Sequence, residues 1–548
     1  MPILRHQIVD IHDRQVFPAE VEVEDGLIKS IRPLGNDEPI DPGHLLPGFV
    51  DAHVHVESSM LPPTEFARVA VRHGTVATVS DPHEIANVLG EEGLEFMLEE
   101  AARSCIPIHF GVPSCVPATE FETSGARLDA AAVGRLLADD RFRYLSEVMN
   151  WPGVLQDDPE VMAKIAAAKR LGKPIDGHAP GLRGEDAKRY AAAGITTDHE
   201  CVTIEEARDK AEAGMNILIR EGSAARNLEA IWPILLEFPH LAMFSTDDAH
   251  PEDLLRGHID RSVARCVAHG VEVFDVLRAA CINPVEHYGL PTGLLRVGDR
   301  ADFIVVDDLV DFRVRQTWIG GTLIARDGEC LVPADRSATP NRFRKARFAP
   351  ADFTIAAGGG TDPVEVLTIL ANDGDLITGE TTTFLKPQSD MLEPNVEEDT
   401  LLLAVCNRYQ PAPPALAFIR GFKLRNGAIA TSIAHDSHQV IAVGTTRGAV
   451  CAAVNTVFEL QGGLAVVGEG RTDTLALPIA GLMSDQPAEE VAAAYERLTT
   501  TAKYLGSDLR APFMTLSFMA LLVIPSLKLS DLGLFDARLF QFAAIRTT

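Results

Sequence analysis

The sequence is poor in the features typical of secreted, membrane-spanning and nucleic-acid-binding proteins. Its eight cysteines include no Cys-x-x-Cys pair, which argues against a zinc ribbon and a disulfide framework and favours buried, reduced thiols. The longest apolar run, residues 514–524, is too short to span a bilayer. Basic residues number 49 against 78 acidic ones, and the formal charge of -29 repels phosphate backbones and anionic lipids. These absences predict no nucleic acid polymer and no membrane as partners, and they leave a small molecule.

The amino-terminal residues lack a basic segment followed by a long apolar core, so we expect no secretory signal and a cytoplasmic location. The chain also lacks an internal repeat and a low-complexity tract. What it does have is 46% hydrophobic residues over 548 positions. That is enough apolar material for roughly two or three domains with substantial cores.

The middle of the chain predicts a (β/α)8 TIM-like barrel. Residues 47–290 alternate short apolar strands with amphipathic helical patterns, and their length of about 240 residues matches that fold. The helical patterns include residues 84–103, 129–138, 158–171 and 184–193. The eight strand candidates that the fold requires end near these residues: His55, Asp81, Val112, Glu147, His178, His199, Arg220 and Asp247.

The flanks of this barrel predict two further domains. Residues 1–46 and 291–335 both alternate apolar and polar positions, which indicates one small β-sandwich domain assembled from both flanks. Residues 336–347 read as a basic, proline-containing linker, and residues 350–548 are strand-rich at first and then helical around 486–503. We therefore expect a C-terminal α+β domain and an α/β fold class for the chain as a whole.

A pair of histidines follows the first predicted barrel strand. A short, mainly apolar run, residues 47–52, leads into His53 and His55, whose i, i+2 spacing places both imidazoles on one face of a strand. Two neutral imidazoles on one face can chelate one metal ion. A hydrogen-bonded histidine pair without a metal is the alternative, and the spacing alone does not decide between the two.

Further ligand-type residues fall at the ends of other predicted strands, and the carboxyl ends of barrel strands meet at one rim. His178, His199 and Asp247 add two imidazoles and a carboxylate, and Glu147 could bridge two ions with its two oxygens. Either Asp247 or Asp248 could be the ligand, and strand direction favours Asp247. This donor set suits manganese, iron or zinc, and two divalent ions would lower the pKa of water toward neutrality. The sequence therefore predicts a metal-dependent hydrolase.

The first, second and seventh predicted strands are followed by further polar residues that should lie beside the metal ligands. Such residues could bind a substrate, transfer protons or hold an additional ion, and capping of the following helices is the alternative. The residues expected to contact a substrate here are Ser58, Asp81, His83, Arg220 and Glu221, and those expected to transfer protons are Glu57 and Glu84.

Several blocks of the sequence resemble the amidohydrolase superfamily and, more closely, its adenine deaminase family. The HxH motif at 53–55 marks only the superfamily, whereas HVESS at 55–59 and DPHEIANVLG at 81–90 are specific to this branch. Further similar blocks are VPSCVPAT (112–119), YLSEVMNWPGV (144–154), DGHAPGL (176–182), TTDHE (196–200), REGS (220–223), STDD (245–248), AHDSHQVIAVG (434–444) and PFMTLSFMALLVIPSLKL (512–529). The resemblance therefore extends over nearly the whole chain.

The resemblance implies hydrolytic deamination of adenine to hypoxanthine and ammonia, a reaction of purine salvage and adenine catabolism. It implies two divalent metal ions with the ligands His53, His55, Glu147, His178, His199 and Asp247. Relatives commonly bridge their metals with a carboxylated lysine from strand four, but no lysine stands there in this chain, so Glu147 must serve. Metal-held hydroxide would attack C6 of the purine, while Asp247 and His199 act catalytically and Glu57 or Glu84 assists at the ring.

The C-terminal part departs from the family in places that could affect specificity. Residues 407–415 and Lys423 differ from the usual pattern, and the stretch that contains His435, Asp436 and His438 is expected at the mouth of the substrate site. Deamination of another aminopurine and hydrolysis of a cyclic amide are therefore the alternative activities. A metal-free barrel that acts as a scaffold is an alternative from another class. For an enzyme of this kind, a homo-oligomer, most simply a dimer, is the expected assembly.

Overall fold

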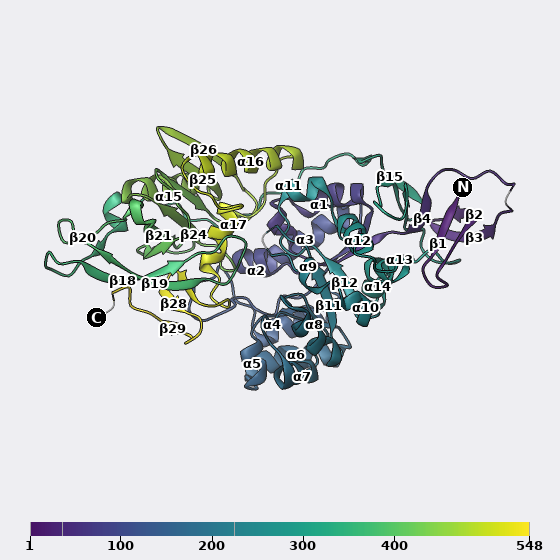
Figure 1. The fold of residues 1–548 in the computed structure, drawn as a ribbon, viewed down its shortest axis with the longest axis horizontal. Helices are drawn as coiled ribbons and strands as arrows, with labels where there is room; N and C mark the ends of the chain where they lie inside the picture. Colours follow the sequence, from purple (N-terminus) through teal and green to yellow (C-terminus); the bar gives the residue numbers. More distant parts are fainter. Residues whose placement is uncertain (1, 36, 224, 547–548) are drawn as a thin grey trace.

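Three parts of this mixed α/β molecule follow one another along its long axis (Figure 1). The computed structural model describes residues 2–35, 37–223 and 225–546. The N-terminal strands lie at one end, the middle of the chain occupies the centre, and the green and yellow C-terminal part lies at the other end. None of the helices in the described ranges combines the length and the apolar character that a bilayer-crossing segment needs.

The central part contains all the strands that the sequence predicted there. Parallel pairing joins β5 to β6 and β7, β8 to β9, and β10 to β11 and β12. Strand β6 is buried at every position, as expected of a parallel strand that is covered on both faces. The strands are β5 (Phe49–Val54), β6 (Thr75–Ser80), β7 (Ile108–Phe110), β8 (Leu145–Val148), β9 (Ile175–Gly177), β10 (Thr197–Asp198), β11 (Asn216–Arg220) and β12 (Ala242–Ser245).

Backbone hydrogen bonds also connect these three groups of strands to one another. The bonds run from Val112 N to Tyr144 O at 2.9 Å, from Thr196 N to Ile175 O at 2.8 Å and from Asp247 N to His53 O at 2.9 Å. The last of them brings the end of β12 beside the end of β5. Residues that are far apart in the chain are thereby placed at neighbouring strand ends.

The helix predicted over residues 84–103 forms as two helices, α2 (His83–Leu89) and α3 (Glu91–Arg103). Gly90 separates them with φ 65° and ψ -139°, a conformation that only glycine adopts readily. A Cβ at this position would also lie 2.9 Å from the Cβ of Ala126. The other predicted helices form close to their expected positions, as α4 (Ala130–Leu137), α6 (Pro159–Leu171) and α7 (Gly184–Ala192).

A sheet of the order β16-β15-β14-β13-β4-β1-β2-β3 covers the N-terminal end of the molecule. Strand β4 lies between β1, which it pairs with in parallel, and β13, which it pairs with antiparallel. Gly48 alone separates β4 from β5, and a Cβ there would lie 2.0 Å from a methyl carbon of Val76. The strands are β1 (Ile3–Asp10), β2 (Gln15–Glu24), β3 (Leu27–Pro33), β4 (His44–Pro47), β13 (Phe303–Val306), β14 (Val314–Ile319), β15 (Thr322–Arg326) and β16 (Glu329–Cys330).

The C-terminal part is built on a second sheet, of the order β19-β18-β22-β21-β24-β23-β25-β26. Helix α15 (Arg447–Leu460) packs on this sheet, and α16 (Ala488–Tyr504) packs against α11 (Pro251–Arg256) of the central part. The strands are β18 (Val364–Leu370), β19 (Gly379–Leu385), β21 (Leu401–Cys406), β22 (Ala415–Arg420), β23 (Ala428–Thr431), β24 (Val440–Gly444), β25 (Gly463–Gly468) and β26 (Arg471–Ala476). The segment after β23 and the segment around α17 (Pro512–Ser517) face the central strand ends.

Candidate active site

Three donor atoms converge where β5 and β12 end. His53 and His55 point to the same side of β5, and their Nε2 atoms lie 3.2 Å apart. Oδ1 of Asp247 lies 3.5 Å from Nε2 of His53 and 3.3 Å from Nε2 of His55. Asp247 has a φ of 53°, a left-handed conformation that costs energy outside glycine and is typical of functional positions. All three side chains are buried, so the atoms face one another rather than water.

Glu147, at the end of β8, lies between the histidines of different strands. Its Oε2 is 3.0 Å from Nδ1 of His178 and 3.1 Å from Nε2 of His199. Its Oε1 is 3.6 Å from Nε2 of His55. The two carboxylate oxygens thus face different imidazoles, which is the arrangement that a bridging ligand requires.

Arg220 joins the site from the end of β11. Its Nη1 lies 2.8 Å from Oδ2 of Asp247, and both of its terminal nitrogens contact Glu200. Burial alone would raise the pKa of Glu200, but Arg220 holds that pKa well below its usual value. Oε1 of Glu200 lies 3.4 Å from Nε2 of His199. Sequence reasoning did not select Glu200, and its place directly after His199 was the available signal.

The residues that follow β6 extend the site on its other side. Nδ1 of His83 lies 3.2 Å from Oδ2 of Asp81 and 3.4 Å from Oε1 of Glu147. The carbonyl oxygen of Asp81 is 3.1 Å from Nδ1 of His55. His83 therefore faces the same oxygen of Glu147 as His55 does.

The C-terminal part reaches this group through a short segment after β23. His435 Nδ1 lies 2.7 Å from Oε1 of Glu84, and His438 Nε2 contacts the other oxygen of the same carboxylate. Oδ1 of Asp436 lies 3.7 Å from Nε2 of His83. The site is thus assembled from the central strand ends and the C-terminal part together.

Glu57 and Ser58 follow His55 in a single 3-10 turn. Backbone N–H of Ile85 donates to Oε1 of Glu57 at 3.2 Å, while Oε2 has no hydrogen-bond partner among the described residues. Burial raises the pKa of Glu57 to about 7. Ser58 donates to Oδ1 of Asp248 at 2.5 Å. Of the two adjacent aspartates, Asp247 therefore faces the imidazoles and Asp248 faces this serine.

The cavity at this site has an excess of buried negative charge. Arg220 is the sole arginine or lysine among the described residues that line it. Burial would lower the pKa of His55 and of His83, but neighbouring carboxylates raise both well above the usual value. Buried carboxylates need positive charge nearby, and clustered imidazole and carboxylate donors suit a divalent metal ion that can supply it. The lining carboxylates are Glu84, Glu147, Glu200, Asp247, Asp248 and Asp436.

An apolar wall completes the cavity. Its side chains are Met149, Leu376, Phe518 and Leu521. The ring of Phe518 stacks on the imidazole of His435, with centroids 4.4 Å apart and planes inclined by 12°. The wall was not predicted from the sequence, because apolar residues carry no chemical signature and most of these come from the C-terminal part.

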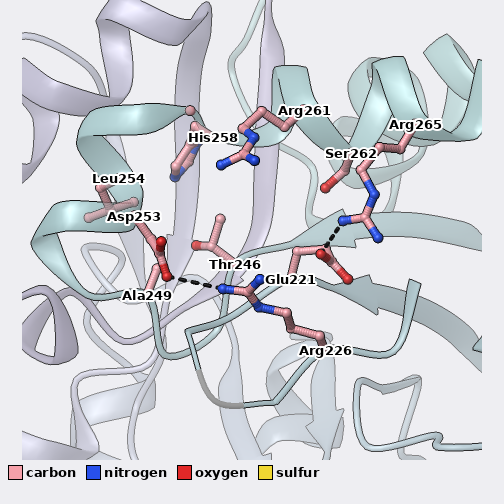
Figure 2. Close-up of a pocket in the computed structure, with 11 residues that line it drawn as sticks. Glu221, Arg226, Thr246, Ala249, Asp253, Leu254, His258, Arg261, Ser262 and Arg265 are labelled. Atoms are coloured by element: carbon pink, nitrogen blue, oxygen red, sulfur yellow. Dashed lines mark hydrogen bonds and ion pairs between the residues drawn. The ribbon is translucent and has the colours of Figure 1, made fainter. Parts of the chain in front are cut away.

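Glu221 does not join the site, which corrects the prediction for this residue. Neighbouring positions along a strand point to opposite faces, so Arg220 turns toward Asp247 and Glu221 turns away. Figure 2 shows Glu221 at a separate cavity, where it pairs with Arg265 while Arg226 pairs with Asp253. Glu221 therefore belongs to an ion pair at this separate cavity and not to the cluster around Glu147.

Comparison with known proteins identifies the chain. The profile of the amidohydrolase family matches residues 44–324, and that of the adenine deaminase C-terminal domain matches residues 375–541. Adenine deaminase of Salinibacter ruber is 55% identical over 98% of this chain and 97% of that protein. Those of a Sulfurovum species and of Methanosarcina mazei are 52% and 49% identical, each over 98% of both chains.

The chain belongs to the adenine deaminase family. This confirms the resemblance that the sequence blocks indicated, and membership of the amidohydrolases implies a TIM-barrel-like central domain with additional domains. In this adenine deaminase family member, the predicted residues that come together are His53, His55, Glu57, Ser58, Asp81, His83, Glu84, Glu147, His178, His199, Arg220, Asp247, His435, Asp436 and His438.

Proposed function

We propose that this protein hydrolyses adenine to hypoxanthine and ammonia at the cluster around Glu147. Relatives named adenine deaminase match it over nearly their full length, which supports the substrate. The observation that carries the proposal is the position of Glu147, with one oxygen toward His178 and His199 and the other toward His55. A cluster of this kind supports hydrolysis rather than a structural role.

Two divalent cations, manganese or iron with zinc as a further option, fit the donor groups of this site. His53, His55 and Asp247 would hold one ion, His178 and His199 the other, and Glu147 would lie between them. The excess of buried carboxylates over arginine and lysine side chains supports this loading, because each ion would supply positive charge that otherwise has to come from protonated imidazoles. When bound, such ions lower the pKa of water and so supply a nucleophile near neutral pH.

Three carboxylates would move the protons. Asp247 would accept the proton of the attacking water through Oδ1 and later pass it to the departing amine, while Arg220 holds Oδ2. Glu57, whose pKa is raised to about 7 by burial, would donate to a ring nitrogen through its unpartnered Oε2. Glu84 would assist at the ring in a position fixed by His435 and His438.

Further polar residues that line the cavity or lie beside it would bind the purine. A planar base would lie against the apolar wall around Phe518, and its ring nitrogens and exocyclic amine would need donors and acceptors from the polar rim. His199 would act both as a ligand and in catalysis. The residues proposed to contact or orient the base are Ser58, Asp81, His83, Arg220, His435, Asp436 and His438.

We also propose that the eight central strands close into a (β/α)8 barrel, residues 47–290. The backbone hydrogen bonds between strand groups, including that from Asp247 N to His53 O at 2.9 Å, support closure. The sheet that contains β1–β4 and β13–β16 would form the small β-sandwich domain from residues 1–46 and 291–335, and residues 350–548 would form the C-terminal α+β domain. The paired strands from both flanks of the chain support the first of these divisions.

The direct test is ammonia release from a panel of aminopurines and cyclic amides. The protein would be depleted of metal and reconstituted separately with manganese, iron or zinc. We expect adenine to be the preferred substrate, with full activity at two ions per chain. Turnover of a hydantoin or a dihydropyrimidine without turnover of adenine would contradict the proposal.

The variant Glu147→Gln tests the bridging role of Glu147 in the metal site. The amide keeps the size of the side chain but loses the charge and one acceptor oxygen, so we expect fewer bound ions and a rate at least about a hundredfold lower. Metal analysis of the same samples would separate loss of ions from loss of chemistry. A fully loaded and fully active Glu147→Gln would rule out the bridging role.

A further inference from the structure

A buried lysine lies behind the apolar wall of the cavity. Lys528, in β27 (Leu527–Ser530), is 0% exposed and forms no ion pair with any described residue. Burial lowers the pKa of Lys528 to about 7, and only the more distant carboxylate of Asp375 opposes this shift. Burying an ammonium group without a carboxylate partner is costly, so we looked to the hydrogen bonds of Lys528 for the reason that a lysine is buried here.

Those contacts are two backbone carbonyls. Nζ of Lys528 donates to the carbonyl oxygen of Leu376 at 2.8 Å and to that of Phe518 at 3.0 Å. The side chains of both acceptor residues line the cavity. One ammonium therefore holds together two pieces of the wall that are far apart in the sequence.

The wall is in turn connected to the polar side of the site. Phe518 stacks on His435, and His435 bonds to Glu84. Backbone N–H of His435 also donates to the carbonyl of Ser517 at 3.1 Å, next to the acceptor that Lys528 binds. A shift of the segment at Phe518 would therefore move the apolar surface and the imidazole together.

A second side chain joins one of the two wall segments to β27. Thr378 donates through Oγ1 to the carbonyl of Leu527 at 2.8 Å and accepts from Ser526 N at 3.0 Å. Neither bond reaches Phe518. Thr378 thus fastens the Leu376 segment alone, whereas Lys528 fixes the spacing between both segments.

We propose that Lys528 is a positioning residue that sets the apolar wall against which the face of the substrate ring rests. It does not line the cavity, and its hydrogen bonds reach none of the proposed metal ligands. This proposal rests on the proposed function, because the wall has a substrate to position only if a planar base binds there. Lys528 would therefore affect binding of the base more than the chemical step.

Lys528→Met tests this role, because methionine keeps most of the length and apolar volume but donates no hydrogen bond. We expect the KM for adenine to rise about tenfold, because the two hydrogen bonds that join the segments of the wall are lost, with kcat changed by less than about threefold. Metal content should stay at the wild-type value. An unchanged KM, or a fall in kcat alone, would overturn the proposal.

Thr378→Val is the matched control, since it removes two hydrogen bonds at the same segment without touching the link to Phe518. It should lower the thermal midpoint while leaving the KM within about twofold of wild type. An equal rise of KM in Thr378→Val and Lys528→Met would mean that both act through stability alone, and would overturn a specific role for Lys528.

The variant Leu376→Ala changes a side chain of the apolar wall itself. It therefore tests the role of the wall even if Lys528→Met does not fold. Removing this side chain should also raise the KM, and an unchanged KM would overturn the proposal even if Lys528→Met gave no folded protein. Failure of the proposed function is distinguishable from these outcomes, because wild type would then release no ammonia from adenine. An active wild type with a normal KM in Lys528→Met would overturn the positioning role only.

Discussion

Arg220 and Asp247 form a buried ion pair across the neighbouring strands β11 and β12, with Nη1 and Oδ2 2.8 Å apart. The pair occupies one oxygen of Asp247 and leaves Oδ1 facing His53 and His55. Because both of its terminal nitrogens also contact Glu200, the arginine pairs with two carboxylates beside the imidazoles. It therefore fixes the direction of the group proposed to carry the proton.

Replacing Arg220 by methionine should destabilise the protein and nearly abolish activity. The change leaves Glu200 and Asp247 buried without their cation, and breaking a buried pair in this way typically costs about 3–5 kcal/mol. Thermal unfolding of the metal-loaded protein and ammonia release would measure both effects. Arg208→Gln is the control, since its pair with Glu237 is exposed and should contribute less than about 1 kcal/mol. Similar losses in the two variants would argue against this account.

Asp247→Asn and Asp248→Asn should separate the two adjacent aspartates. The first removes the group that faces both imidazoles, so we expect a rate lower by about 10²–10⁴-fold together with weaker metal binding. The second disturbs the bond to Ser58 and should keep the wild-type metal content. Metal analysis and initial rates on the same preparations are the measurements. Loss of metal in Asp248→Asn with retention in Asp247→Asn would reverse the assignment.

Glu221→Gln should leave catalysis intact. Glu221 pairs with Arg265 behind the strands and lines the separate cavity of Figure 2, so its charge does not reach the reacting atoms. We expect kcat/KM within about twofold of wild type and a stability change below about 1 kcal/mol. A fall in kcat/KM of more than tenfold would show that the substrate contacts this glutamate after all.

The stability of the protein relative to Lys528→Met should rise with pH. The pKa of Lys528 falls from its usual value to about 7 in the folded protein, so above pH 7 the unfolded chain binds more protons at this residue than the folded one. The destabilising contribution is complete below pH 7 and disappears as the pH approaches the unfolded pKa. Thermal midpoints of both proteins at several values between pH 6 and about 10 would show the divergence. A constant difference would mean that Lys528 keeps an ordinary pKa.

The sequence predicted the parts of the molecule whose signal is local. Strand ends could be placed because short apolar runs alternate with amphipathic helices, and His53, His55 and His178 follow such runs directly. The helix predicted over residues 84–103 is divided at Gly90, because the backbone conformation of this glycine is not helical although the residues on both sides follow a helical pattern. Glu221 was misplaced because sequence proximity to Arg220 says nothing about which face a side chain takes.

The parts that could not be predicted depend on contacts between distant segments. His435 and His438 were selected only through the family resemblance, since nothing local indicates that they meet Glu84. Phe518 and Leu376 form one wall only because two segments of the C-terminal part pack side by side. Long-range packing of this kind leaves no periodic pattern in a single sequence.

The position of β4 between β1 and β13 sets an order of events during synthesis. The first strands leave the ribosome long before residues 303–306, which supply the missing neighbour of β4, have been translated. Until β13 has been made, the edge of β4 that pairs with it has free backbone N–H and C=O groups. Such an edge can pair with strands of other chains unless it is covered. Strand β4, directly before the strand that carries His53 and leads to His55, therefore gains its second neighbour only late in synthesis.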